Sequence, residues 1–133
     1  MPENGPPHWE RPLVLDLGPR SAGSLPRVAQ WLGARPVAPG TIEIDLADEL
    51  RNPWGILHGG VVAMLADLAA EDAAEGRATT ETVLHFLAPN RLGPVRARAR
   101  VLGRRRDGHV ARVEIRDEGA DRVTAVAVTT SRA

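Results

Sequence analysis

The sequence has 133 residues, of which 43% are hydrophobic, and its 17 basic residues balance 17 acidic ones. This length and apolar content suit one domain with its own core, and the zero net charge gives no support for nucleic-acid binding. The sequence contains no cysteine, which excludes disulfides, thiolate metal sites and cysteine nucleophiles.

The first third of the chain predicts an arm and three short elements. Residues 1–11 are polar and rich in proline, and indicate a flexible arm ahead of a single domain at 12–133. This arm lacks a signal-peptide pattern and no apolar run is long enough to span a bilayer, so we expect a cytoplasmic protein without membrane contact. The expected elements are a strand at 13–17, a helix at 24–32 and a strand at 41–46, with a turn at Pro39 and Gly40.

The segment 59–75 is the clearest helix, because it is rich in Ala, Leu and Met, contains no proline and is followed by Gly76. Its residues are apolar almost all round, so we expect this helix to be buried on most sides. Asp67 and Glu71 lie four positions apart and form one acidic line along it.

Four strands are predicted after this helix, at 79–87, 95–102, 110–116 and 123–130. Apolar residues alternate strictly with arginines in 95–102, and Asp107-Gly108 indicates a hairpin turn. We interpret the four strands as a meander. The chain then has an α+β fold in which one antiparallel sheet curls round a single central helix, and two such units can pair edge to edge.

The run His58-Gly59-Gly60 stands at the start of the long helix. The first turn of a helix carries unpaired N–H groups and a partial positive charge, and two glycines let a ligand oxygen approach the backbone closely. These are the requirements of an oxyanion site. Taken alone, two glycines before a helix more often mark a loop that needs them for its backbone angles.

Asp67 is a charge in an otherwise apolar helix, which is unfavourable unless it is paired or faces a cleft. It either reaches solvent or caps a neighbouring backbone, or it faces a partner subunit across a wet active-site cleft. In the cleft it would serve as nucleophile or general base. His58 and His85 have no second ligand at metal-binding spacing, so we predict no metal.

The run from Asn52 through His58-Gly59-Gly60 to Asp67 resembles the hotdog-fold acyl-CoA thioesterases of the phenylacetate-degradation (PaaI-like) family. As in that family, the acid follows the histidine by nine positions. The stretch Thr79–Pro89 resembles the strand after the helix, and the resemblance covers about residues 41–131. It implies a hotdog fold, hydrolysis of an acyl- or aryl-CoA to the free acid and CoA, a homodimer or homotetramer, and no cofactor beyond the CoA of the substrate.

The resemblance also implies roles for individual residues. Asp67 would be the nucleophile or general base, Gly59 N–H of the other subunit would polarise the thioester, and His58 and Asn52 would position the thioester and water. The residues implied in substrate binding are Gly60, Thr79, Pro89, Asn90, Arg91, Arg104, Arg105, Arg106 and Arg132, whose basic members would meet the CoA phosphates. The residues that suggest an apolar acyl pocket are Trp54, Met64, Val83 and Leu84.

Three other functions stay open. Hotdog hydratases carry an Asp-x-Asn-Pro-x-x-His run, but here His58 follows Asn52 too late and the aspartate is missing. A non-catalytic acyl-CoA-binding hotdog domain would lack the helix acid, which is present here as Asp67. No feature of the sequence excludes a purely structural oligomer.

Overall fold

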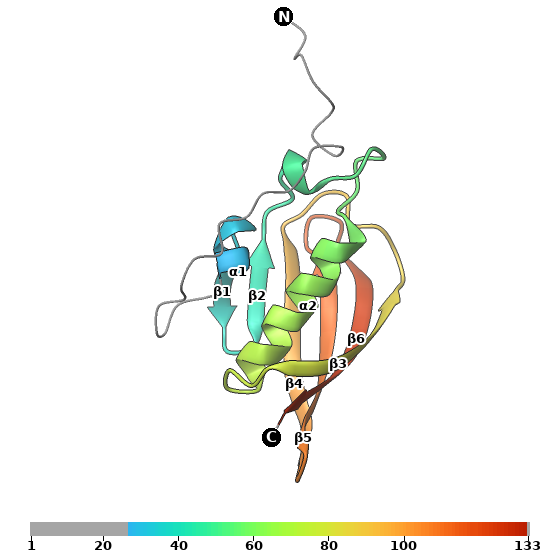
Figure 1. Ribbon diagram of the computed structural model, residues 1–133. Helices are drawn as coiled ribbons and strands as arrows, with labels where there is room; N and C mark the ends of the chain where they lie inside the picture. Colours follow the sequence, from blue (N-terminus) through green and yellow to red (C-terminus); the bar gives the residue numbers. More distant parts are fainter. Residues whose placement is uncertain (1–26, 133) are drawn as a thin grey trace, which may run out of the picture.

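The computed structural model describes residues 27–132, which form a six-stranded antiparallel sheet curved around one long helix (Figure 1). This confirms the predicted α+β architecture. The predicted arm, the strand at 13–17 and the start of the first helix lie outside the described residues. The elements are α1 (Arg27–Trp31), β1 (Arg35–Ala38), β2 (Thr41–Ile44), the 3₁₀ helix η2 (Asp48–Leu50), α2 (Gly59–Ala73), β3 (Thr79–Phe86), β4 (Val95–Arg105), β5 (Gly108–Asp117) and β6 (Arg122–Arg132).

The order of the strands in the sheet is β1-β2-β4-β5-β6-β3. The predicted four-strand meander is therefore wrong, because β3 pairs with β6 at the far edge and only β4, β5 and β6 are consecutive neighbours. The connection 87–94 allows this crossing. Eight extended residues reach roughly 26 Å, whereas three strand spacings amount to about 14 Å.

Strand β1 is an element that the sequence did not predict. It pairs with β2 at one edge of the sheet and contains Pro36, which cannot donate to a neighbouring strand. An edge position tolerates this proline because one side of the strand needs no partner. Arg35 in the same strand forms ion pairs with Glu43 and Asp45 at 2.8 Å and 3.0 Å.

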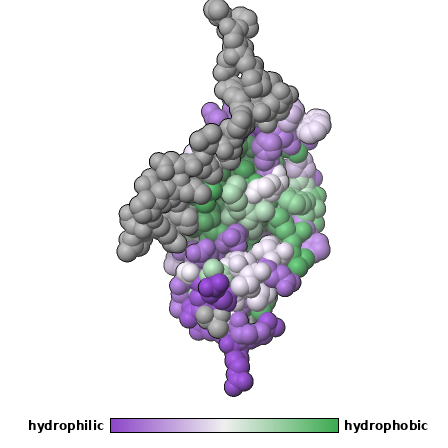
Figure 2. All heavy atoms as spheres, in the orientation of Figure 1, coloured by the Kyte–Doolittle hydropathy of each residue, from purple (hydrophilic) through white to green (hydrophobic). Residues whose placement is uncertain are grey.

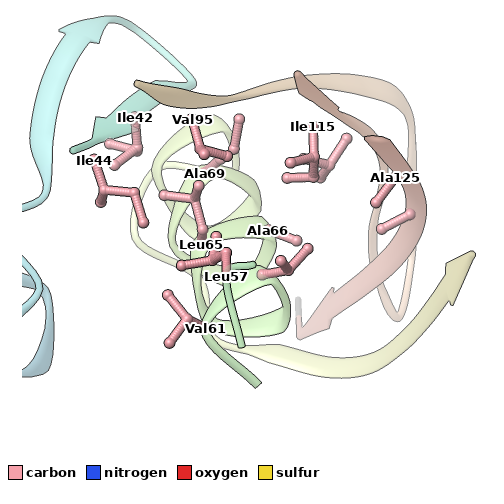
Figure 3. Close-up of a cluster of buried hydrophobic side chains, with 14 of the residues drawn as sticks. Ile42, Ile44, Leu57, Val61, Leu65, Ala66, Ala69, Val95, Ile115 and Ala125 are labelled. Atoms are coloured by element: carbon pink, nitrogen blue, oxygen red, sulfur yellow. The ribbon is translucent and has the colours of Figure 1, made fainter. Parts of the chain in front are cut away.

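The core lies between α2 and the inner face of the sheet (Figure 3). Leu65, Ala66 and Ala69 of the helix are completely buried against Ile42 and Ile115 of the strands. The alternation predicted in β4 is confirmed, since its apolar residues up to position 99 are buried and its arginines lie on the outer face. The small helix residues let α2 lie close to the sheet.

The other side of α2 is not fully covered within one chain. Ala63, Met64, Asp67 and Leu68 are half-buried along this side. The expected burial on most sides therefore holds for one side of the helix in the single chain. None of the helices in the described part is long and apolar enough to cross a membrane.

Replacing Leu65 by Ala should lower the free energy of unfolding by about 2–5 kcal/mol, because the change leaves a cavity in a completely buried layer. Leu102→Ala removes the same atoms from a side chain that is 52% exposed, and should change stability by less than about 1 kcal/mol. Urea unfolding of both variants at one protein concentration measures the difference. A loss in Leu65→Ala as small as the one expected for Leu102→Ala would show that Leu65 is not part of the core.

Candidate active site

The start of α2 is held by backbone contacts from two other segments. His58 is the N-cap residue and its N–H donates to the carbonyl of Leu50 at 3.0 Å. Its carbonyl accepts from Val61 at 3.0 Å, which begins the helix. Leu57, one position earlier, donates its N–H to the carbonyl of Asn90 at 3.1 Å. The segment 57–58 is thereby attached both to η2 and to the connection between β3 and β4.

Gly59 and Gly60 present the free N–H groups of the helix start. Both residues are exposed, and no described residue accepts a hydrogen bond from either N–H group. The first turn contains no acidic residue, so the positive end of the helix dipole is open to an incoming anion. A Cβ built on Gly59 would lie 3.4 Å from the ring of Phe86, which therefore borders this position. The arrangement is chemically suited to bind a developing oxyanion.

Asp67 faces a shallow groove between α2 and β3. The groove has a volume of about 360 Å³ and is lined by Asp67, Ala63 and Met64 together with residues 79–82 of β3. Asp67 makes no ion pair or hydrogen bond with any described residue. A half-buried carboxylate without a partner is available to act on a ligand in the groove.

The helix acid and the free N–H groups are far apart within one chain. Gly59 and Asp67 are eight positions apart on α2, which corresponds to about 12 Å along the helix axis. A nucleophile or base must lie about 3 Å from the carbon whose oxygen the N–H groups hold. Within one chain, the Gly59 N–H and the Asp67 carboxylate therefore cannot meet at the same carbonyl carbon.

Asn52 and Thr79 have different surroundings. The side-chain oxygen of Asn52 accepts hydrogen bonds from the N–H groups of Trp54 at 3.0 Å and Ile56 at 3.3 Å, so it shapes the loop before the helix. The hydroxyl of Thr79 is buried beside the groove that contains Asp67 and has no hydrogen-bond partner among the described residues. The roles of both residues toward a substrate stay predictions.

The basic residues assigned to CoA lie at both ends of the molecule. Arg91 is exposed in the connection beside the helix start. Arg104, Arg105 and Arg106 belong to the hairpin between β4 and β5, which projects at the opposite end (Figure 1). Arg104 pairs with Glu75, just after the end of α2, at 3.6 Å. Arg132 ends β6 at the same end of the sheet, opposite Gly108.

The apolar pocket proposed from the sequence requires a correction. Val83 pairs with the exposed Val128 and Leu84 with the buried Ala127, so the two neighbours point to opposite faces of the sheet. Val83 therefore lies on the outer face, away from α2, and only Leu84 faces the helix. Figure 2 shows further hydrophobic surface over the end of β3 and the loop after it, where Phe86 and Leu87 are 59% and 62% exposed.

The sequence interpretation missed a buried carboxylate close to the helix start. Asp117 is completely buried and accepts hydrogen bonds from the N–H groups of Arg91, Leu92 and Gly93 at 2.8–3.1 Å. Asn90, expected to bind substrate, is 3% exposed, and its side-chain oxygen accepts from the hydroxyl of Thr124 at 2.7 Å. The signal was present in the sequence, because Asp117 continues the alternation of buried residues in β5.

Other parts of the described structure offer less chemistry. Residues 27–132 contain no group of three or more His, Cys, Asp or Glu side chains that could hold a metal ion. Hollows on the outer face of the sheet are lined by arginines and glutamates, including Arg96 and Glu114. Arg96 is held there in an ion pair with Glu43 at 2.7 Å. The groove beside Asp67 and the start of α2 are therefore the best candidates for a site.

A family model described as the acyl-CoA thioesterase N-terminal domain matches residues 47–132, well over half of the chain. The matched region contains the helix start, α2 and strands β3 to β6. The sequence has no significant match among curated proteins.

Solved structures share the fold at low sequence identity. The thioesterase HI1161 from Haemophilus influenzae is 23% identical, with 94% of this chain and 93% of that chain covered and a TM-score of 0.72. The PaaI protein of the phenylacetic acid degradation operon of E. coli is 22% identical, with 79% and 82% covered and a TM-score of 0.71. The BH2602 protein from Bacillus halodurans, crystallised with CoA, is 18% identical, with 82% and 76% covered and a TM-score of 0.72. These likenesses establish the hotdog fold.

Asp117 should make the stability of the protein depend on acid pH. Burial acts to raise the pKa of its carboxyl, but hydrogen bonds from four backbone N–H groups outweigh burial and lower the pKa below its ordinary value. The ionised form therefore stabilises the fold above the unfolded pKa of about 3.9, and this contribution is lost as the pH falls through the folded pKa.

We expect the free energy of unfolding to fall less steeply below about pH 4 in Asp117→Asn than in the parent, because the variant has no carboxyl to protonate. Urea unfolding measured at a series of pH values gives both slopes. Parallel curves would mean that the pKa of Asp117 is the same in the folded and unfolded chains.

Proposed function

Because the chain belongs to the acyl-CoA thioesterase N-terminal domain family, we propose that it hydrolyses the thioester of an acyl- or aryl-CoA to the free acid and CoA, in the manner of PaaI-like enzymes. The observation that carries the proposal is the pair of half-sites on α2. Gly59 offers an N–H at the positive end of the helix and Asp67 offers a carboxylate in a groove, and neither group has a partner within residues 27–132. Thioester hydrolysis needs both groups at one carbonyl.

A second copy of the chain would bring the two halves together. Strand β3 is an edge strand whose residues are mostly exposed, and unpaired edges favour pairing with another strand. A two-fold axis across this edge would place two α2 helices antiparallel on the same side of one continuous sheet. The start of each helix would then approach the groove of the partner. We therefore propose a homodimer, or a homotetramer made of two such dimers.

In the proposed reaction, the thioester oxygen accepts a hydrogen bond from Gly59 N–H, with Gly60 beside it. The helix dipole stabilises the negative charge as the carbon becomes tetrahedral. Asp67 of the other copy either attacks the carbon or takes a proton from an attacking water. The carbon–sulfur bond breaks, the sulfur leaves as the CoA thiolate and takes up a proton, and water supplies the second oxygen of the acid. His58 and Asn52 orient the thioester and the water.

The same arrangement gives the basic residues a common role. An antiparallel pair of α2 helices would place the hairpin of one chain, with Arg104, Arg105 and Arg106, near the helix start of the other. Arg91 and Arg132 would add positive charge along the subunit interface. Guanidinium groups bind phosphates in bidentate fashion, so this surface suits the phosphates of CoA. The fold relative BH2602 was crystallised with CoA, which supports CoA binding by this fold.

Asp67→Ala should lower kcat by about 100-fold or more, because it removes a positioned nucleophile or base. Asp67→Asn should lose activity to a similar degree, since the amide keeps the shape but neither attacks nor accepts the proton. The measurement is release of free thiol from a panel of acyl- and aryl-CoAs, with enough chain lengths to find the preferred acyl group.

Glu71→Gln is the matched control, because Glu71 is the next carboxylate on the same line of α2. It should keep kcat within about threefold of the parent, as is usual for a carboxylate outside the chemistry. Activity in Asp67→Ala equal to the parent would reject the assigned role. Binding of acyl-CoA without turnover by the parent would favour the non-catalytic alternative.

The molar mass in solution should be at least twice that of one chain, because a single chain lacks one half of each site. Static light scattering over a range of protein concentrations measures it. A monomer that turns over acyl-CoA at full rate would contradict the shared site, since Gly59 and Asp67 would then have to act from one helix.

A further inference from the structure

We propose that Asp117 is a positioning residue that holds the N–H groups at the start of α2 in place through the connection between β3 and β4. This inference rests on the proposed function, because it assigns the same N–H groups to the thioester oxygen. Asp117 does not contact these N–H groups itself. It acts through a short series of backbone hydrogen bonds that begins at its carboxylate and ends at Leu57, one residue before His58.

The first part of the series is the set of hydrogen bonds that the Asp117 carboxylate accepts from the connection. Its Oδ2 atom accepts from Arg91 N–H at 2.8 Å and Leu92 N–H at 3.1 Å, and its Oδ1 atom accepts from Gly93 N–H at 2.9 Å. Three successive amides directed at one buried carboxylate leave this backbone little freedom. Ala120 N–H adds a longer bond to Oδ1 at 3.3 Å, which ties in the turn between β5 and β6.

The second part joins the connection to the helix start. Asn90 directly precedes the three amides that bind Asp117. Its carbonyl accepts a hydrogen bond from Leu57 N–H at 3.1 Å. The side chain of Asn90 is fixed by Thr124, a completely buried residue of β6. Arg51 adds a bridge, because its Nη1 atom donates to the carbonyls of Arg91 at 3.0 Å and Gly55 at 2.7 Å.

The consequence for catalysis follows from geometry. Leu57 precedes His58 and Gly59, so a shift of the connection is transmitted along the backbone toward the Gly59 N–H. An oxyanion donor is effective only within a few tenths of an ångström of its best distance, and misplacement by about 1 Å can lower the rate by as much as 100-fold. A bond made mainly in the transition state affects kcat more than KM.

Two variants disturb the connection by different means. Asp117→Asn replaces one acceptor oxygen with an N–H₂ group, which opposes amides that need an acceptor. Gly119→Ala keeps the carboxylate but adds a Cβ that would overlap the carbonyl oxygen of Gly93. Glu43→Gln is the matched control, because Glu43 is also a buried carboxylate, with Arg35 and Arg96 as partners on the outer face of the sheet.

The experiment combines amide hydrogen exchange of the full chain with steady-state kinetics, at a temperature where all four proteins are folded. We expect the protection of Leu57 N–H to fall together with that of residues 91–93 in Asp117→Asn and Gly119→Ala, by roughly tenfold or more. We expect kcat to fall by about tenfold in both variants with KM within about threefold. Glu43→Gln should leave the protection of Leu57 and kcat close to those of the parent.

Three results would overturn the proposal. The first is loss of protection at 91–93 with Leu57 unchanged, which would show that the two loops are not coupled. The second is a loss of exchange protection at Leu57 N–H with an unchanged kcat. The third is an equal loss at Leu57 in Glu43→Gln, which would mean a general loss of stability. If the parent has no thioesterase activity, the proposed function fails, whereas the exchange data still decide whether Asp117 holds Leu57.

Discussion

Asp67 and Gly59 lie on one rigid helix, and the distance between them prevents one chain from bringing both groups to the same carbonyl. Eight residues of α2 keep the carboxylate about 12 Å along the axis from the free N–H groups. A helix that packs its small and apolar residues tightly against a sheet cannot bend to shorten this distance. The uncovered side of α2 and the edge strand β3 lie next to the same groove. Pairing of two chains along β3 would therefore cover the helix and complete the proposed site.

Three carboxylates of the chain are half or fully buried. Two of them are held by partners within the fold, and the third has none among the described residues. Glu43 has two arginine partners, and Asp117 has four backbone amides, and both have pKa values below the ordinary range despite their burial. In the folded chain each of these two carboxylates is ionised and accepts hydrogen bonds from its partners. Asp67 has no such partner among the described residues. Its charge is available to a ligand because none of residues 27–132 compensates it.

The sequence predicted those parts of the fold that depend on local patterns. Composition and Gly76 located α2, and alternation located β4 with its buried and arginine faces. Strand neighbours were not predictable in the same way, because β3 reaches β6 through pairing that no local pattern encodes. Strand β1 was missed since Pro36 argues against a strand except at an edge. Gly59 and Asp67, which we propose as the two halves of the site, were visible in the sequence as exceptions to their surroundings. The hydrogen bonds from residues 91–93 to Asp117 join segments distant in sequence, so no local pattern predicts them.

The strand order also explains why a buried carboxylate lies so near the helix start. Because β3 is at the far edge, the chain must cross the end of the sheet through 87–94 before β4 can begin beside β2. That crossing passes the start of α2, where Asn90 receives the N–H of Leu57. A long connection of this kind would be mobile unless its backbone groups had partners. Asp117 supplies those partners from the end of β5. The connection that the topology requires is thereby fixed where it receives the N–H of Leu57, next to the start of α2.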